Sequence, residues 1–466
     1  MKNDLKTTMR ISVVEGIFAQ FHSSLTGIGS SFVTKTAVLL QASPLQFSIL
    51  SGITQLCQFF QLYAVFHNHD HPSRKKPCIM FAFWGRLLNI FLGLSFAFAT
   101  IISPRTALYF FITLLFFSAA FQTISSNMWV AWMTALIPSK IRGRFFSRRM
   151  QIHMFSGFIF GYVLSFLIDL FEVPQNNWRY TILEKYNLQN IFSANYLVYG
   201  LSGVFIIGSI IGLYGLLILN KQTERPMRKI SSDNFSVFEP LKNHNFRRLM
   251  YFGMWWMFAI GFGAAFWGPF MLKVLKFSLV QMQLYGMISA LGMLISFRFW
   301  GKFIDHFGNK TAMKITVVIG SINPTFWLFF SETSYSLIWV EAFTSGVMWS
   351  GANLVTFNFV LSIAPRGKEQ HWSALYSALG GLLMLSTILL SGILFPPALT
   401  VGTRYLYPEQ VLFGLTALLR LSSEIPLYFV HEPKAIPLRR TMGIASEIAL
   451  TKMLKFKDMV YKVLNI

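Results

Sequence analysis

Twelve stretches of the chain are almost continuously apolar, and each has about the length that a helix needs to cross a lipid bilayer. A transmembrane helix takes about 20 apolar residues, whereas the strands of an outer-membrane barrel alternate apolar and polar positions. The pattern therefore predicts an all-α integral membrane protein with twelve transmembrane helices. The expected spans cover residues 11–39, 47–66, 78–100, 106–136, 150–171, 195–219, 247–272, 278–300, 313–330, 335–361, 373–395 and 407–430.

The composition excludes the soluble domains that length alone would suggest. Of the 466 residues, 54% are hydrophobic and only 12% are charged, whereas soluble proteins carry about 25% charged residues. The mean hydropathy is +0.52, and a water-facing surface could not hide 49 Phe. Both cysteines, Cys57 and Cys78, fall at or inside apolar stretches, so no disulfide framework is expected.

The net charge of +22 follows the expected topology. Thirty of the 40 Lys and Arg residues lie on every second connection or at the two ends of the chain. Because cytoplasmic loops carry the excess of basic residues, we expect both termini in the cytoplasm and a bacterial inner-membrane location. The charge would also attract anionic membrane lipids, and no nucleic-acid partner is expected.

The longest basic connection divides the spans six and six. The expected parts are an N-terminal six-helix bundle (1–219), a cytoplasmic linker (220–246), a C-terminal six-helix bundle (247–430) and a basic tail (431–466). Apolar and basic residues interleave in the tail, which favours an amphipathic helix lying on the inner leaflet. A tail that binds a partner protein is the alternative.

The two halves resemble each other weakly in sequence. The segment LLQASPLQFSILSGI (39–53) matches VLKFSLVQMQLYGMI (274–288) at an offset near 235 residues, and ALIPSKIRGRFFSRR (135–149) resembles SIAPRGKEQHWSALY (362–376). Two parallel six-helix repeats are an architecture of secondary transporters, which bind their substrate between the halves near the bilayer midplane.

A sharper motif follows the eighth span, where Gly301, Asp305, Gly308 and Lys310 form the pattern G-x-x-x-D-x-x-G-x-K. Gly301 would permit a close helix approach, and Gly308 would permit a tight turn. The pattern resembles the loop signature of the major facilitator superfamily, in which this loop is a conformational latch for the outward-facing state. The resemblance implies the major facilitator fold. The matching loop of the first half has His71 in place of the expected Asp.

Polar groups inside the spans are the candidates for binding substrate or coupling ions, because a charged side chain costs roughly 2.5–3.5 kcal/mol in the membrane. Glu341 is followed at helical spacing by Trp349 and Asn353, and we expect these residues to share one helix face. In the family, spans one, four, seven and ten line the cavity. A structural pairing of Glu341 with a neighbouring helix is the alternative.

Further candidates lie in the first half, where Gln122 and Asn127 are on the fourth span. Glu15 and His22 are two turns apart on one face of the first span, so they could pass a proton. A salt bridge of Glu15 near Arg10 at the inner surface is the alternative.

Three arginines inside the spans are given structural roles. Arg86 and Arg298 are expected to extend toward the cytoplasmic ends of their spans or to pair there. Arg420 is expected to form an ion pair with Glu424, four residues further on.

No nucleotide-binding or hydrolase motif is present, so we expect neither an enzyme nor a cofactor. The H-x-H-x-H run at residues 67–71 favours a solvated loop over a metal site.

The leading hypothesis is a secondary active transporter that moves a small-molecule substrate by alternating access. Proton coupling stays open. The alternative is a non-transporting scaffold, receptor or lipid-handling protein that keeps the transporter fold. A polar cavity would favour transport, whereas a filled apolar interior would favour a scaffold.

Overall fold

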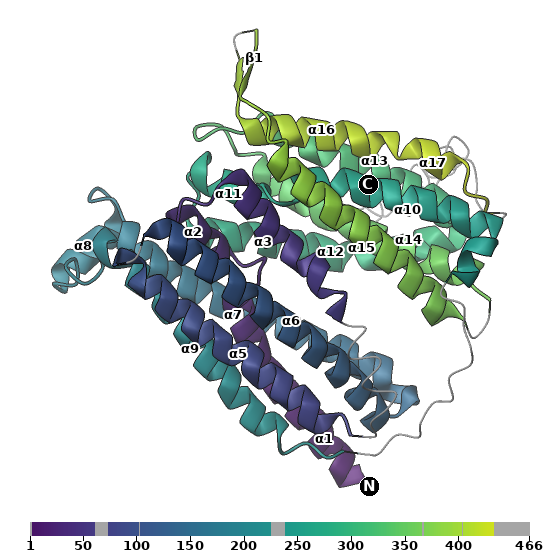
Figure 1. Cartoon of the computed structure of the whole chain (residues 1–466), viewed down its shortest axis with the longest axis horizontal. Helices are drawn as coiled ribbons and strands as arrows, with labels where there is room; N and C mark the ends of the chain where they lie inside the picture. The colour runs from purple at the N-terminus through teal and green to yellow at the C-terminus, as the bar shows by residue number, and fades with distance from the viewer. Residues whose placement is uncertain are drawn as a thin grey trace, which may run out of the picture.

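The computed structural model describes residues 2–60, 73–101, 103–224, 238–365, 368–402 and 404–432. A helix lies over each of the twelve predicted spans (Figure 1). The elements of the first half are α1 (Lys2–Thr26), α2 (Ser31–Leu39), α3 (Pro44–Cys57), α5 (Lys75–Ala97), η1 (Phe98–Thr100), α6 (Pro104–Leu136), α7 (Ser139–Asp169), η2 (Leu170–Glu172), α8 (Trp178–Lys185), η3 (Ala194–Tyr196) and α9 (Leu197–Leu219).

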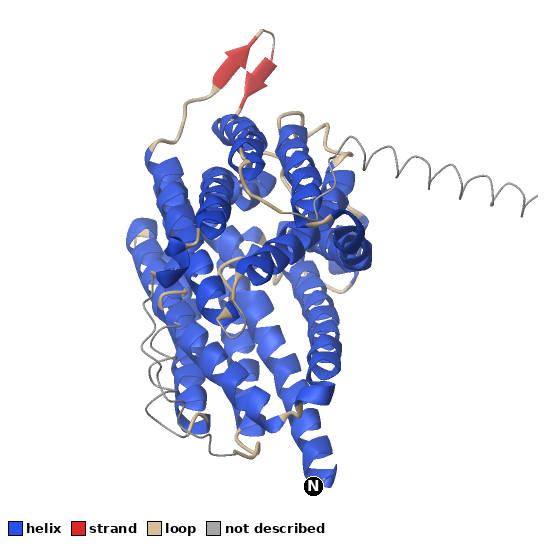
Figure 2. Ribbon diagram, turned by 90° about the vertical axis from the view of Figure 1, so that its right-hand side faces the viewer, coloured by secondary structure: helices blue, strands red, loops and turns tan. Residues whose placement is uncertain are grey.

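The second half repeats the six spans and has a short hairpin in the place of α8, drawn in red at the top of Figure 2. Its elements are η4 (Glu239–Lys242), α10 (His244–Ala264), α11 (Trp267–Lys273), α12 (Leu279–Phe307), α13 (Asn309–Trp327), α14 (Ile338–Ile363), α15 (Glu369–Ile393), β1 (Leu399–Val401), β2 (Arg404–Leu406), α16 (Pro408–Ser422) and α17 (Glu424–Tyr428). The two strands are antiparallel, with Thr400 opposite Tyr405.

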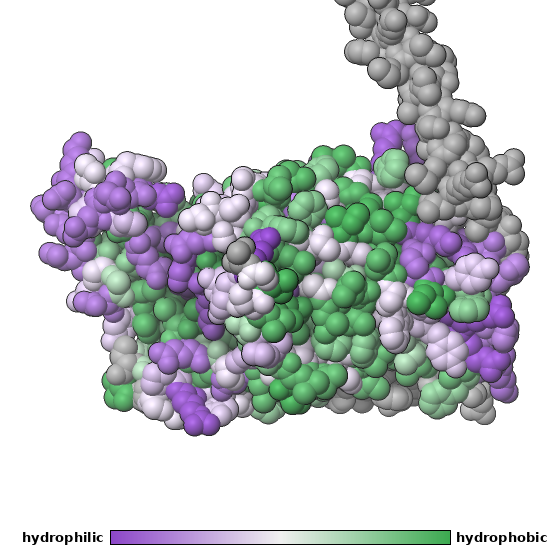
Figure 3. Space-filling model, turned by 90° about the horizontal axis from the view of Figure 1, so that it is seen from above, coloured by the Kyte–Doolittle hydropathy of each residue, from purple (hydrophilic) through white to green (hydrophobic). Residues whose placement is uncertain are grey.

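Within the described residues, nine segments are helical, long and apolar enough to cross a membrane. Three predicted spans are not continuous helices: the first divides into α1 and α2, the seventh into α10 and α11, and the twelfth into α16 and α17. At the first break Ser30 ends the irregular segment, because its hydroxyl accepts the Val33 N–H (3.2 Å) and so caps α2. The surface agrees with a membrane protein, since a wide hydrophobic belt separates two polar ends in Figure 3.

The sequence repeat is present in the local structure at an offset of 235 residues. Gln41 and Lys276 both have a φ of 55°. Two residues later, Ser43 and Ser278 begin α3 and α12 with the same capping box, completed by Gln46 and Gln281. Reciprocal caps of this kind satisfy two backbone donors that a helix start otherwise leaves free.

The repeat also fixes a helix start at the end of the bundle where α5 and α13 begin. The Glu224 carboxylate accepts the N–H groups of Arg74 (2.5 Å) and Lys75 (2.9 Å), and the Glu432 carboxylate accepts those of Asn309 (3.0 Å) and Lys310 (2.6 Å). A carboxylate is favourable there because a helix N-terminus carries partial positive charge. We call this end of the bundle, where residues 2, 75, 219 and 244 lie, the linker end.

The two halves contact each other toward the opposite end, which we call the far end. The Asp169 carboxylate at the end of α7 accepts the N–H groups of Leu279 and Val280, both at 2.9 Å, and so caps α12 of the other half. Gln283 donates to Ser31 across the same boundary (3.0 Å). The α1, α5 and α6 group diverges from the α10, α14 and α15 group toward the linker end (Figure 1).

Candidate functional site

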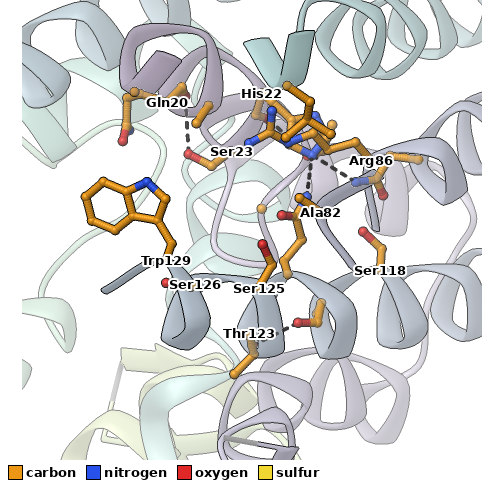
Figure 4. Close-up of a pocket in the computed structure, with 18 of the residues that line it drawn as sticks. Gln20, His22, Ser23, Ala82, Arg86, Ser118, Thr123, Ser125, Ser126 and Trp129 are labelled. Carbon is orange, nitrogen blue, oxygen red and sulfur yellow. Dashed lines mark hydrogen bonds between the residues drawn. The ribbon is translucent and has the colours of Figure 1, made fainter. Parts of the chain in front are cut away.

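A cavity of about 590 Å³ lies inside the first half, and we call it the first cavity. Its walls come from α1, α3, α5, α6, α7 and α9. Figure 4 shows α1 residues His22 and Ser23 on one side and α6 residues Ser125, Ser126 and Trp129 on the other. About half of the residues that line it have polar side chains, so it can form hydrogen bonds with a polar solute.

His22 lies in this cavity and is 3% exposed. Its Nδ1 lies 3.3 Å from the Gly208 carbonyl, which can only accept, so Nδ1 carries the hydrogen. The amide nitrogens of Gln122 (3.0 Å) and Asn89 (3.4 Å) then donate to Nε2. The site therefore holds a neutral imidazole between two amides, which can exchange donor and acceptor ends if the ring gains a proton.

Glu15 is the only acidic side chain among the described residues that line the first cavity, and it is shared by two arginines. Its Oε1 lies 3.4 Å from Arg86 and its Oε2 lies 3.7 Å from Arg149. Arg86 also donates to the Gly212 carbonyl, and Arg149 donates to the Ser12 carbonyl (3.1 Å). Glu15 and Arg86 are buried, and the Arg149 side chain is 15% exposed. With two guanidinium groups and one carboxylate, the cluster carries one positive charge more than it has negative charges.

The Arg149 guanidinium also lies over the Trp129 ring, 4.0 Å from its centroid. This cation–π contact fixes both side chains at the wall of the cavity. Sequence reasoning missed this role of Arg149, because the residue belongs to the basic RGRFFSRR run that fits the topology. The sequence signal for an interior position would have been its distance from the start of α7, because Arg149 lies about three turns into that helix.

A second cavity of about 440 Å³ is lined mostly by α10, α14 and α15. Trp349 and Asn353 line it, as expected for the tenth span, and Trp256 and Tyr376 are their neighbours there. The helix α3 borders both cavities, with Thr54 and Cys57 in the first and Gln55 in the second, where Gln58 just after the helix also lies.

Glu341 does not line either cavity. It is 3% exposed, accepts a hydrogen bond from Tyr285 (2.8 Å), and feels the charge of Arg420. The expectation that it shares a face with Trp349 and Asn353 is wrong, because residues spaced by four drift about 40° per step around a helix of 3.6 residues per turn. After three steps Asn353 has turned about 120° away from Glu341.

Two other expected pairings are also wrong. Glu15 pairs with Arg86 and Arg149 in the interior and not with Arg10 at the surface. Arg420 donates to the Gly320 carbonyl (3.0 Å) and faces Glu341, whereas Glu424 feels the charges of Lys314 and Lys310. Of the two outcomes expected for Arg86, pairing is confirmed, because it is buried within its span and pairs with Glu15.

The remaining candidates lie outside the cavities. The Asn127 amide donates to the Thr123 carbonyl of its own helix (3.2 Å). Asp305 is exposed at the linker end, and Gly308 has the φ of 86° that its expected turn requires. A Cβ at Gly301 would meet nothing within 4 Å, so the expected close helix approach is wrong in this conformation. Lys310 donates to the carbonyls of Tyr428 (2.8 Å) and Val430 (2.7 Å), within its own half.

His71, the H-x-H-x-H run and the basic tail beyond Glu432 lie outside the described residues. Among the described residues, no group of three or more His, Cys, Asp or Glu side chains could hold a metal ion.

A multi-pass helical bundle with one cavity inside the first half and another mostly within the second is typical of membrane transporters. The model of the Major Facilitator Superfamily matches residues 17–388. The chain belongs to this superfamily, whose members bind and transport small molecules, and it is accordingly a secondary transporter of a small solute.

Solved structures share the fold at low sequence identity. A point mutant of the nucleoside transporter NupG is 12% identical with a TM-score of 0.68, and the match covers 91% of this chain and 100% of that one. The inward-open xylose transporter XylE from E. coli is 13% identical with a TM-score of 0.62, over 94% and 99% of the two chains. A bacterial homolog of the human lysosomal transporter Spinster, inward-facing, is 14% identical with a TM-score of 0.55, over 93% and 99%. No curated protein matches the chain.

Proposed function

We propose that the protein carries a small polar solute across a bacterial inner membrane, that the solute binds in the first cavity, and that protons drive the transport. The linker end, with the N-terminus and residue 432, would face the cytoplasm, as the distribution of basic residues predicts. The described conformation would then be open to the cytoplasm and closed at the far end.

The observation that carries this proposal is the position of the contacts between the halves relative to the cavities. Asp169, Gln283 and their partners join the halves at the far end, while polar cavities lie on both sides of α3. Rocking of the halves about such a contact would alternate access to a central site. A scaffold that only kept the fold would need no polar cavity, so this lining supports transport.

His22 is the residue that we assign to proton coupling. It contacts two amides that line or border the solute site, so protonation of Nε2 would oblige Gln122 and Asn89 to turn their oxygens toward the ring. Such a turn would change the hydrogen bonds offered to the solute. Glu15 is held by two arginines and is less free to change its charge, and Glu341 stays a candidate outside the cavities.

The test is uptake into proteoliposomes with and without an inward proton gradient. The His22→Gln variant keeps a polar side chain but cannot take up a proton, so uptake should no longer respond to the gradient. His244→Gln, at an exposed position at the start of α10, is the matched control and should behave as wild type. Intact proton-driven uptake in His22→Gln would remove His22 from the mechanism, and its loss in Glu341→Gln would transfer the role to Glu341.

A further inference from the structure

We infer that the transported solute is a small organic anion whose negative group binds between Arg86 and Arg149 in the first cavity. This inference rests on the proposed function, since it names the class of solute that the same cavity would carry. It comes from the charges and unpartnered donors of the cavity wall.

The charge count of the wall is unequal. Arg86 and Arg149 face the single carboxylate of Glu15 at 3.4 and 3.7 Å, and neither distance is that of a short, two-pronged ion pair. The two histidines of the wall do not offset the excess. His22 is held as a neutral ring by its hydrogen bonds, and His153, beside Gly16 and Arg149, could only add positive charge. One positive charge is therefore left over in the wall of the cavity.

Donors without partners accompany this charge. Arg86 is 5% exposed, and its Nε has no hydrogen-bond partner among the described residues. The Nε1 of Trp129, which stacks under Arg149, is also buried and unpartnered within that part of the chain. Buried donors without acceptors are costly. Neither atom has appreciable accessible surface in this conformation, so an anion would first balance the charge and would reach these donors only after the side chains turn.

The second cavity has a different character. No charged side chain lines it among the described residues; its polar groups are amides, hydroxyls and indole rings, as at Gln55, Asn353 and Trp349. A charged group of the solute would therefore be held by the first half, and the uncharged remainder would reach toward α3 and the second half. An uncompensated positive charge is expensive in a membrane protein, so a neutral solute would leave that cost in place.

The experiment compares neutral and anionic partners of similar shape on the purified full-length protein. The pairs are D-glucose with D-glucuronate, glycerol with glycerate, and uridine with uridine 5′-monophosphate, all at constant ionic strength. A compound that binds the native state raises the melting temperature. We expect at least one anion to raise the melting temperature while its neutral partner does not.

The variants Arg149→Gln and Arg148→Gln form a matched pair. Both remove one positive charge from α7, but Arg148 is exposed and does not line the cavity. Arg149→Gln should weaken binding of the anion about tenfold or more, the loss expected for one charge-assisted hydrogen bond, while Arg148→Gln should leave it unchanged. Equal effects of the two variants would overturn the inference.

A second measurement keeps the inference testable if Arg149→Gln fails to fold. Quenching of Trp129 fluorescence is obtained as the difference between wild type and Trp129→Phe, and is divided for each quencher by the quenching of free N-acetyltryptophanamide. The normalised quenching should be more efficient with iodide than with neutral acrylamide. Equal or weaker quenching by iodide, or a panel in which neutral partners shift the melting temperature as much as anions, would overturn the anion assignment. Counterflow transport of a neutral solute would overturn the anion assignment but leave the proposed function intact. If none of the compounds that bind were transported, the proposed function itself would be contradicted.

Discussion

Both halves of the molecule bury charged side chains, but they place them differently with respect to the cavities. In the first half, Arg86 and Glu15 lie in the cavity wall, and Arg86 donates to a glycine carbonyl of α9. In the second half, Arg420 donates to a glycine carbonyl of α13 and faces Glu341, away from both cavities. In both halves an arginine thus donates to a glycine carbonyl of a neighbouring helix. In the first half this bond lies beside a cavity, and in the second half it belongs to a closed structural cluster.

The physical difference is access. A charge beside a cavity can be compensated by water or by a solute, whereas a charge in a closed interior depends on its protein partners alone. The helix starts of the two halves, by contrast, are anchored alike by Glu224 and Glu432. The repeat therefore keeps the same scaffold at the linker end and diverges in its interior.

The largest expected effect comes from breaking the closed cluster of the second half. Arg420→Met would leave the buried Glu341 carboxylate without its positive neighbour, and such losses cost about 3–5 kcal/mol. The melting temperature in detergent should fall strongly, and adding Glu341→Gln should recover most of the loss. Arg149→Gln should cost much less, because Arg86 still balances Glu15. A wild-type melting temperature for Arg420→Met would contradict the contrast between the halves.

The next effect concerns the contact that joins the halves at the far end. Asp169→Asn removes the charge that caps α12, and hydrogen bonds to charged groups contribute about 1.5–3 kcal/mol each. The balance should shift about tenfold or more toward the state open at the far end. The labelling rate of a cysteine at Ser126 by a membrane-impermeant thiol reagent applied at the linker end should fall.

The control for this change is Glu172→Gln, three residues further along the chain. Glu172 pairs with Lys35 of its own half (2.7 Å), with its side chain 40% exposed. Its loss should leave the labelling rate unchanged. If both variants slow the labelling equally, the effect is not due to the bond between the halves.

A smaller and symmetrical effect is expected at the linker end. Glu224→Gln and Glu432→Gln each weaken the cap of one helix start, which is worth about 1 kcal/mol. The two variants should lower the melting temperature by similar amounts, and Glu184→Gln on the exposed surface of α8 should not. A large loss in only one of them would show that the halves are not anchored alike.

The smallest effect is expected at the glycine of the predicted latch. Because a Cβ at Gly301 meets no atom within 4 Å, Gly301→Ala should change the stability by less than about 0.5 kcal/mol. Gly346→Ala is the contrasting variant in the same half, since its Cβ would lie 1.8 Å from the Ser289 carbonyl oxygen and should prevent normal packing of α12 against α14. Strong destabilisation by Gly301→Ala would mean that the latch loop packs closely in another conformation of the cycle.

Local sequence features were enough to predict the helices, the repeat and the family. Apolar length predicts a span without knowledge of its neighbours, and caps such as Ser43 and Ser278 act through residues three positions away. The capping boxes at matching positions explain why the weak repeat was visible at all. The motif around Gly308 was informative for the same reason, because a positive φ is a local requirement.

Which buried polar groups meet one another became clear only from the packing of the helices. Helical spacing brings His22 and Glu15 to one cavity because seven residues are close to two full turns. The same reasoning failed for Glu341 and Asn353, which are twelve residues apart. The partners of Glu15 come from positions 71 and 134 residues away, on α5 and α7. Contacts over such separations depend on how whole helices cross, which no local pattern encodes.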